Sequence, residues 1–312
     1  MKRALILLLA ALLAVSCVGR SERIKVDIDK ALKKQVDVRK LYTEATEIPL
    51  HRPEGTTLGQ EGKVVLEVSA DRFFLLDKNE ILVFNGAGDY VTSITSEEPV
   101  IDISVYRDKL LDVLTESAIT EYAVTDCSFQ AAYSIRDKDN DVILKSVARV
   151  DEDSFFMVGQ KDGTFYDCGD LVGKRRLYSG PRPAPDYPVS QSNVPAAEMQ
   201  HSRFFRCGEG VFNFCSRSGE IDKYTGDDFI CVPYVWDFGK RSLAFTNAQK
   251  TEDRIYLAFD LDGKDYVLVY NLDNGKYNVV ESSTFPLGVI YDGSNYHCRQ
   301  EGDGWVIVRY TL

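Results

Sequence analysis

Alternating apolar and polar positions recur in short runs along most of the chain. Between Val64 and Thr95 four such runs follow one another, separated by turns rich in Asp, Asn and Gly. Alternation with β-branched and aromatic residues is typical of strands, and short Asp, Asn and Gly clusters are typical of hairpin loops. The stretch therefore predicts four antiparallel strands, with the sequences VVLEV, RFFLL, ILVF and YVTSIT.

The same unit recurs loosely through the rest of the chain. Further units of four runs are indicated over residues 99–135, 142–179, 199–237 and 243–282. Residues 287–312 supply only three runs, and residues 42–50, which include EIPL, would provide the missing strand. Repeated four-stranded units are the pattern of a β-propeller. The predicted fold is all-β: a six-bladed β-propeller of four-stranded antiparallel blades, closed by an N-terminal strand.

The N-terminus reads as an export signal that ends in a cysteine. Two basic residues precede an apolar stretch of 12 residues from Ala4 to Val15, which is shorter than the roughly 20 that span a bilayer. The small residues before Cys17 resemble the lipobox of bacterial lipoproteins, whose cysteine is acylated and becomes the mature N-terminus. An ordinary signal peptide with an incidental cysteine is the alternative. We expect residues 1–16 to be a lipoprotein signal peptide and Cys17 to carry the membrane anchor.

The residues after Cys17 bear on location. In such lipoproteins an Asp directly after the cysteine tends to retain the protein in the inner membrane, and here that residue is Val18. No acidic cluster of the kind used for surface export follows. The resemblance therefore favours an outer-membrane lipoprotein that faces the periplasm, with the cell surface as the alternative. Residues 17–41 are charged without a clear core face, so we expect a lipidated tether before a propeller over residues 42–312.

The chain is acidic. It carries 37 Lys and Arg against 48 Asp and Glu, a net charge of −11. An acidic protein repels nucleic acid, so a nucleic-acid partner is disfavoured, and solubility explains the charge.

Six cysteines follow Cys17, without a CxxC pair or a compact framework. Several lie within apolar strand patterns, where free cysteine behaves as a small hydrophobic residue. We expect mostly structural thiols, and the sequence leaves their disulfide state open. They are Cys127, Cys168, Cys207, Cys215, Cys231 and Cys298.

Two acidic loops invite comparison with calcium sites. Asp137–Asp141 begins like an EF-hand loop, but Val142 and Ala148 replace the required Gly and Glu. Asp260–Asp265 also departs, with Lys264 at a ligand position. Both are better explained as hairpin loops, and we expect no cofactor, with calcium as the alternative.

A propeller binds ligands in its central channel or on the loops of one face. The polar residues predicted to line the channel carry mixed charges. The simplest expectation is that they form hydrogen bonds and ion pairs with one another and thereby fill the channel. No metal site is predicted. The channel candidates are Glu67, Asp102, Lys145, His201, Arg203 and Asn247. Tyr187 and Trp236 lie near loops and are candidates for stacking on sugar rings.

Three strings carry a family resemblance. KVDIDKALKKQVDVRKLYTEATEIPL, CVPYVWDFGK and PLGVIYDG begin at Lys25, Cys231 and Pro286. Together with the first blade they resemble the six-bladed β-propeller lipoproteins of Gram-negative bacteria, which are related in shape to NHL and TolB-like propellers. The resemblance implies the architecture and leaves the activity open.

Two classes of function remain. The first is a non-catalytic binding module, anchored in the cell envelope by its lipid, that recognises a protein or a glycan. The alternative is a cation-dependent envelope hydrolase or lyase, lactonase-like or glycan-acting, with its site in the channel. No catalytic residues are predicted, because the sequence contains no Ser-His-Asp order, P-loop or HExxH motif.

Overall fold

The structure is a computed structural model of the chain. It describes residues 23–53, 59, 64–134, 143–152, 155–161, 164–170, 176–181, 203–216, 218–224 and 229–312. Within this part of the chain the strands form six four-stranded antiparallel sheets and one two-stranded parallel ladder.

The first three sheets each contain four strands paired in chain order. The first sheet consists of β3 (Val65–Val68), β4 (Arg72–Asp77), β5 (Glu80–Asn85) and β6 (Tyr90–Thr95). The second consists of β7 (Asp102–Tyr106), β8 (Leu110–Leu114), β9 (Ala118–Ala123) and β10 (Phe129–Ser134). The third consists of β11 (Ile143–Arg149), β12 (Phe155–Lys161), β13 (Thr164–Asp170) and β14 (Arg176–Pro181).

The other three sheets follow the same plan, and the last one recruits a strand from the N-terminal region. The fourth consists of β15 (Arg203–Cys207), β16 (Gly210–Phe214), β17 (Ile221–Tyr224) and β18 (Phe229–Tyr234). The fifth consists of β20 (Ala244–Lys250), β21 (Arg254–Leu261), β22 (Lys264–Asn271) and β23 (Tyr277–Glu281). The sixth consists of β24 (Val289–Tyr291), β25 (Ser294–Glu301), β26 (Gly304–Thr311) and β2 (Glu44–Pro49).

The strand β2 pairs antiparallel with β26, with Ile48 opposite Ile307. Just beyond β2, the His51 amide donates to the Gly88 carbonyl of the first sheet at 2.8 Å. Gly88 has a φ of +88°, and a Cβ there would collide with the Pro49 carbonyl, so this close approach requires glycine. The N-terminal strand is thereby fixed to both the last sheet and the first.

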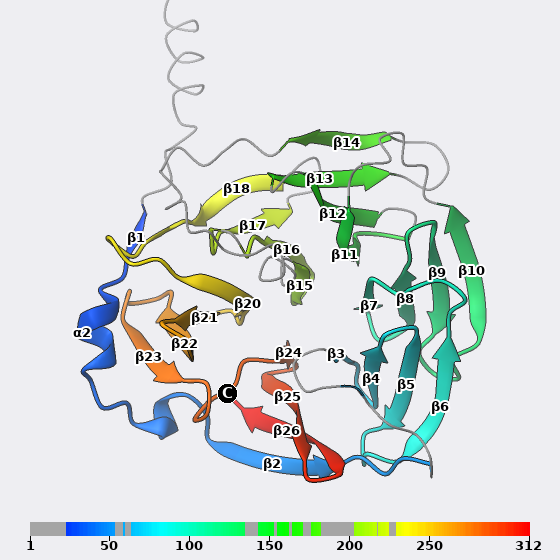
Figure 1. Cartoon of the computed structure of the whole chain (residues 1–312), viewed down its shortest axis with the longest axis horizontal. Coiled ribbons are helices and arrows are strands. Elements are labelled where there is room, and N and C mark those ends of the chain that lie inside the picture. The colour runs from blue at the N-terminus through cyan, green and yellow to red at the C-terminus, as the bar shows by residue number, and fades with distance from the viewer. Residues whose placement is uncertain are drawn as a thin grey trace, which may run out of the picture.

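The six sheets follow one another around a common centre, with the first strand of each nearest to it (Figure 1). Contacts link β3 to β7, β7 to β11, β11 to β15, β15 to β20, β20 to β24 and β24 to β3. The polar side chains on these strands are therefore brought toward one region.

Apolar side chains fill the space between successive sheets. Phe74 and Val83 of the first sheet, for example, pack with Ile103 and Val113 of the second. Because neighbouring sheets cover both faces, β4 and β5 each contain four consecutive buried residues where a half-exposed strand would alternate. The core is thus distributed between the sheets and leaves the centre to polar groups.

The segment before β2 belongs to the folded body, where the sequence had indicated a tether. It contains β1 (Ile24–Lys25), the helix α2 (Ile28–Leu32) and the 3₁₀ turn η1 (Val38–Lys40). β1 pairs in parallel with β19 (Trp236–Asp237), and α2 lies beside β23 (Figure 1). The expectation of a tether over residues 17–41 therefore fails from β1 onward.

Burial explains why this segment is fixed. The side chains of Val26, Ile28 and Ala31 are at most 3% exposed and join the core of the fourth and fifth sheets, and Leu41 joins the next core cluster. Asp27 caps α2 by accepting from the Lys30 amide at 2.9 Å. A helix of five residues is too short to show a 3.6-residue period, which is why the sequence pattern did not reveal it.

No helix among the described residues is long and apolar enough to cross a membrane. Cys127, Cys207 and Cys215 are free thiols. The side chains of Cys168 and Cys231 lie outside the described part of the chain.

Candidate functional site

Three of the predicted channel residues meet at the centre of the molecule. Glu67 lies on β3, Asp102 on β7 and Arg203 on β15. The Arg203 Nη2 lies 2.5 Å from Glu67 Oε1 and 3.8 Å from Asp102 Oδ1. We call these three residues the central ion cluster. It joins strands of three sheets across the centre.

Asp102 is also anchored by hydrogen bonds from β11. The Ser146 hydroxyl donates to Asp102 Oδ2 at 2.5 Å, and the Val147 amide donates to the same oxygen at 3.1 Å. The Ser146 oxygen in turn accepts from the Phe204 amide of β15 at 2.9 Å. Ser146 is fully buried, and its hydroxyl bridges three sheets.

Burial governs the ionisation of the central ion cluster. Burial and the nearby Asp102 charge raise the pKa of Glu67 to about 7, against the opposing effect of Arg203. Burial also raises the pKa of Asp102. For Arg203, burial favours the neutral form, but the two carboxylates outweigh it and raise its pKa. With a pKa of about 7, Glu67 exchanges a proton near neutral pH.

The central ion cluster lies between two cavities, and Arg203 lines both of them. The larger cavity has a volume of about 730 Å³, with Glu67 and Arg203 in its wall. Its rim is formed by hairpins of four sheets, at Arg107–Asp108, Gly208–Glu209, Thr251–Asp253 and Asp292–Gly293. Its size is in the range of small-ligand sites.

The smaller cavity, of about 410 Å³, is lined by Asp102, Lys145 and Asn247. Asn247 Nδ2 donates to the carbonyls of Leu287 and Gly288, so it ties two sheets together. Burial lowers the pKa of Lys145. His297 also lines this cavity, and burial followed by the charge of Arg299 lowers its pKa to about 4.

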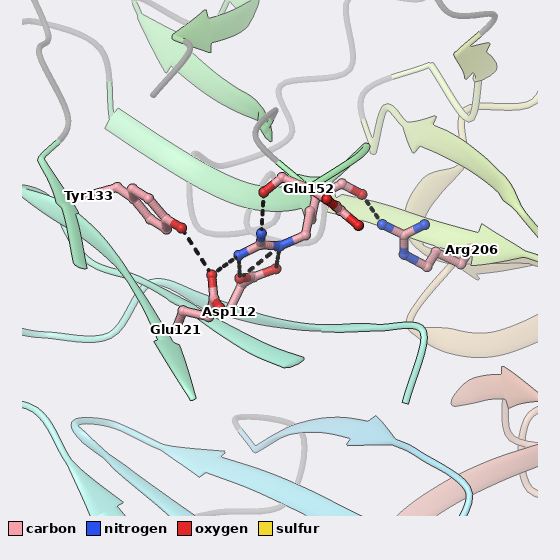
Figure 2. A network of polar contacts seen from close by, with 6 residues as sticks. Asp112, Glu121, Tyr133, Glu152 and Arg206 are labelled. Atoms are coloured by element: carbon pink, nitrogen blue, oxygen red, sulfur yellow. Dashed lines mark hydrogen bonds and ion pairs between the residues drawn. The ribbon is translucent and has the colours of Figure 1, made fainter. Parts of the chain in front are cut away.

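Two cations in the wall of the larger cavity have no ion-pair partner among the described residues. Arg206 of β15 donates through Nη2 to the backbone carbonyl of Arg149 (Figure 2). Its guanidinium lies 5.1 Å from the centre of the Tyr106 ring. Burial lowers the pKa of Arg206. Lys250 of β20 donates through Nζ to the Thr251 carbonyl at 2.6 Å.

The other cations of this cavity are paired. Arg107 lies 2.9 Å from Glu209, and Arg254 lies 3.3 Å from Asp253. Arg206 and Lys250 were not among the predicted site residues. The available signal was a basic residue close to the end of a first strand, next to last in β15 and last in β20, shortly before the turns that form the cavity rim.

The rim contains a turn in an unfavourable backbone conformation. Arg107 and Asp108 have φ values of 50° and 54°, in the left-handed region that favours glycine. Asp108 accepts from the Tyr291 hydroxyl at 2.8 Å and from the Ala70 amide at 3.2 Å. These bonds hold the turn against the first and the sixth sheet, and strained positions of this kind cluster at functional sites.

A second group of buried charges lies between the second and third sheets. Arg149 is 1% exposed and lies 2.7 Å from Asp112 and 2.5 Å from Glu121 (Figure 2). Its Nη1 donates to the Glu152 carbonyl at 2.9 Å, and the Tyr133 hydroxyl donates to Glu121 at 3.2 Å. We call Asp112, Glu121 and Arg149 the intersheet ion cluster. None of its three members was among the predicted site residues.

Of the remaining predicted site residues, Trp236 is the one that the structure describes. Cys17, Tyr187 and His201 lie outside the described residues, as does the loop Asp137–Asp141. Trp236 is 4% exposed and donates through Nε1 to the Gly219 carbonyl at 2.9 Å, so its ring is part of the core and not open to a sugar.

The loop Asp260–Asp265 is a hairpin turn between β21 and β22, as its composition indicated. Asp260 Oδ1 accepts from the Gly263 amide at 3.2 Å. Among the described residues, no group of three or more His, Cys, Asp or Glu side chains is placed to hold a metal ion.

Comparisons with known proteins bear on the fold. No protein-family model matches the chain, and neither does any curated protein. A solved Bacteroides fragilis protein described as exported is similar in structure, with a TM-score of 0.61, 10% identity, and 92% of this chain and 98% of that chain covered.

Two other solved structures align less closely. Virginiamycin B lyase of Staphylococcus aureus aligns with a TM-score of 0.48 and 12% identity over 82% of this chain and 83% of its own. BamB of Moraxella catarrhalis aligns with a TM-score of 0.41 and 12% identity over 79% and 84%. At such identities the likeness concerns the fold alone. Four-stranded antiparallel sheets arranged around a centre make that fold a β-propeller.

Proposed function

We propose that the chain is a lipid-anchored binding module of the cell envelope, built as a six-bladed β-propeller. Six four-stranded sheets and the contact of β24 with both β20 and β3 support six blades in a closed ring. The pairing of β2 with β26 supports closure by the N-terminal strand. Closure removes the exposed sheet edges that an open arrangement would leave at its ends.

The larger cavity carries the proposal of binding. The central ion cluster occupies the middle of the molecule, so the cavity is a bowl with a charged floor that opens among four hairpins. Clefts of this size with a few placed polar groups are typical of ligand sites. The partner is a glycan or a protein segment that enters the bowl, and the role is binding without catalysis.

The location rests on the N-terminal sequence. Cys17 follows the small residues of a lipobox, and the similar Bacteroides fragilis protein is described as exported. The anchor would hold the propeller at the outer membrane, facing the periplasm. In cells fed a labelled fatty acid, the natural chain should take up label and sediment with membranes. Cys17→Ala should abolish the label. Uptake of equal label by Cys17→Ala would refute this anchor.

Binding is tested with the lipidated full chain, tagged and cross-linked in its native membrane, with captured proteins and glycans identified by mass spectrometry. Glu252→Trp places a bulky side chain at the exposed rim of the cavity and should abolish capture of the partner. Glu281→Trp makes the same change at an exposed position on β23, the outermost strand of the same sheet, and should leave capture intact. Equal capture by both variants would contradict a site in this cavity.

The cation-dependent alternative has its own test. A calcium site would raise the melting temperature of the full chain with added calcium and lower it with a chelator, because a ligand that binds the folded state stabilises it. The binding module predicts no shift in either direction.

A further inference from the structure

On two adjacent first strands, the wall of the larger cavity carries positive charges that no carboxylate among the described residues pairs with. Arg206 on β15 and Lys250 on β20 lack an ion-pair partner among the described residues, although β15 and β20 are in contact. Lys250 Nζ also lies 5.8 Å from the centre of the Phe212 ring, which places it against the sheet of Arg206. A cation withdrawn from water is costly unless a charge or hydrogen bonds replace the water.

The hydrogen bonds of these two cations satisfy only part of their capacity. A guanidinium has five donor hydrogens, and Arg206 uses Nη2 on one backbone carbonyl while its buried Nε lacks a partner. Lys250 donates to the Thr251 carbonyl and, at 3.5 Å, to the Glu252 carbonyl. Both side chains thus retain donors for an oxyanion in the cavity.

The rim of the same cavity carries negative charges. The carboxylates of Glu252 and Asp292 are exposed and have no ion-pair partner in the described part of the chain. They would repel a polyanion such as a nucleic acid or a multiply charged phosphate. Carboxylates are, however, good acceptors for hydroxyl groups. The cavity therefore combines donors for one anion with acceptors for neutral hydroxyls.

We propose that the larger cavity binds a polyhydroxylated carboxylic acid of the uronic-acid type, with Arg206 and Lys250 contacting its carboxylate and the rim carboxylates accepting from its hydroxyls. This inference rests on the proposed function, since it names the class of glycan that the module recognises. Arginine suits the carboxylate because its planar donors match the two carboxylate oxygens. The cavity volume of about 730 Å³ accommodates a short oligosaccharide.

The test is isothermal titration calorimetry of the lipidated full chain in detergent. The probes are D-glucuronate, its neutral amide, acetate, and a tetrasaccharide of alternating glucuronate and N-acetylglucosamine. We expect glucuronate or the tetrasaccharide to bind, and the amide to bind at least about tenfold more weakly, because a charge-assisted hydrogen bond is lost. Acetate should bind more weakly than glucuronate, since it lacks the hydroxyls.

Variants separate these roles. Arg206→Gln and Lys250→Gln should each weaken glucuronate binding by about tenfold or more. Arg241→Gln is the matched control, because it removes a cation that Asp29 already neutralises and that lines neither cavity. It should change the affinity less than about threefold. Melting curves of each variant establish that the fold is intact. If Arg206→Gln is unstable, Arg206→Lys is used in its place. It should retain part of the affinity for glucuronate, because it keeps the positive charge.

The outcomes distinguish this inference from the proposed function. Equal binding of glucuronate and its amide, or equal losses with Arg241→Gln and Arg206→Gln, would overturn the acidic ligand while leaving a binding cavity. Failure of both glucuronate and the tetrasaccharide to bind would also overturn it. If Glu252→Trp still abolishes partner capture in that case, the proposed function stands with a different ligand.

Discussion

Arg149 and Arg206 are neighbouring arginines, one fully and one partly buried, and their charges are compensated differently. Arg149 is sealed between two sheets and neutralised by Asp112 and Glu121. Arg206 donates to the backbone of Arg149 and packs on the same Tyr106 ring, but it faces a cavity and lacks a carboxylate partner among the described residues. Burial alone therefore does not distinguish an arginine that binds a ligand from one that stabilises the fold. The distinguishing feature is a cation that borders an open cavity and has no carboxylate partner among the described residues.

The largest expected effect is at the sealed arginine. Arg149→Met leaves Asp112 and Glu121 buried without their cation, and it should lower the free energy of unfolding by about 3–5 kcal/mol. Urea unfolding followed by tryptophan fluorescence measures this loss. Adding Asp112→Leu and Glu121→Met to Arg149→Met should recover much of it, because no buried charge remains. A loss below about 1 kcal/mol in the single variant would show that the cluster is not structural.

The next effect is a pH dependence at Glu67. Its pKa is raised from 4.5 to about 7, so between these values the folded state keeps a proton that the unfolded chain has released. Stability is therefore highest below pH 4.5 for this group and falls as pH rises through 7, by at most about 3 kcal/mol. The charged groups that act on Glu67 are Arg203, Asp102 and Arg206.

Unfolding of the natural chain and of Glu67→Gln at pH 5, 6, 7 and 8 isolates this contribution. The difference in stability between the two proteins should shift in favour of the variant as pH rises. A difference that stays constant with pH would contradict the raised pKa of Glu67.

A smaller effect is expected at the hydroxyl that bridges three sheets. Ser146→Ala removes the donor to Asp102 and the acceptor for the Phe204 amide, and it should cost about 1–3 kcal/mol of unfolding free energy. Ser128→Ala removes a hydroxyl that bonds Asp126 at an exposed turn, and it should cost less than about 0.5 kcal/mol. Similar losses of unfolding free energy in the two variants would show that the Ser146 hydroxyl does not stabilise the contact between the three sheets.

The smallest effect on stability is expected at the open arginine. Arg206→Gln removes a cation without leaving a buried carboxylate unpaired, so the unfolding free energy should change by less than about 1 kcal/mol. The same urea experiment that is used for Arg149→Met measures it. A loss as large as that of Arg149→Met would mean that Arg206 serves the fold, and the distinction between the two arginines would disappear.

Strand alternation and turn chemistry were enough to find the sheets. The predicted runs between Val64 and Thr95 correspond to β3, β4, β5 and β6, and the turn before β6 forms because Asn85 Oδ1 accepts from the amides of Ala87 and Asp89. These signals involve residues close together in the chain, so they can be recognised from the sequence alone. The shortage of one run after Leu287 likewise indicated a strand from elsewhere, which is β2.

The missed features depend on contacts between distant residues. Arg149 is separated by 37 residues from Asp112 and by 28 from Glu121, and nothing in the spacing shows that they meet. Trp236 lies beside a loop in the sequence, yet its neighbours in space bury it. Glu67 and Arg203 were placed toward the centre because they lie on first strands. Their 2.5 Å contact follows only from the arrangement of the sheets.

The most direct test of the difference between the two arginines is an NMR titration of the full chain with ¹⁵N-labelled arginine side chains. Arg206→Gln assigns the Arg206 Nε signal by its disappearance. The account predicts that glucuronate shifts this signal in a saturable way and leaves the signals of the sealed arginine unchanged. An Arg206 signal that does not move at saturating glucuronate would contradict the assignment of this arginine to a ligand.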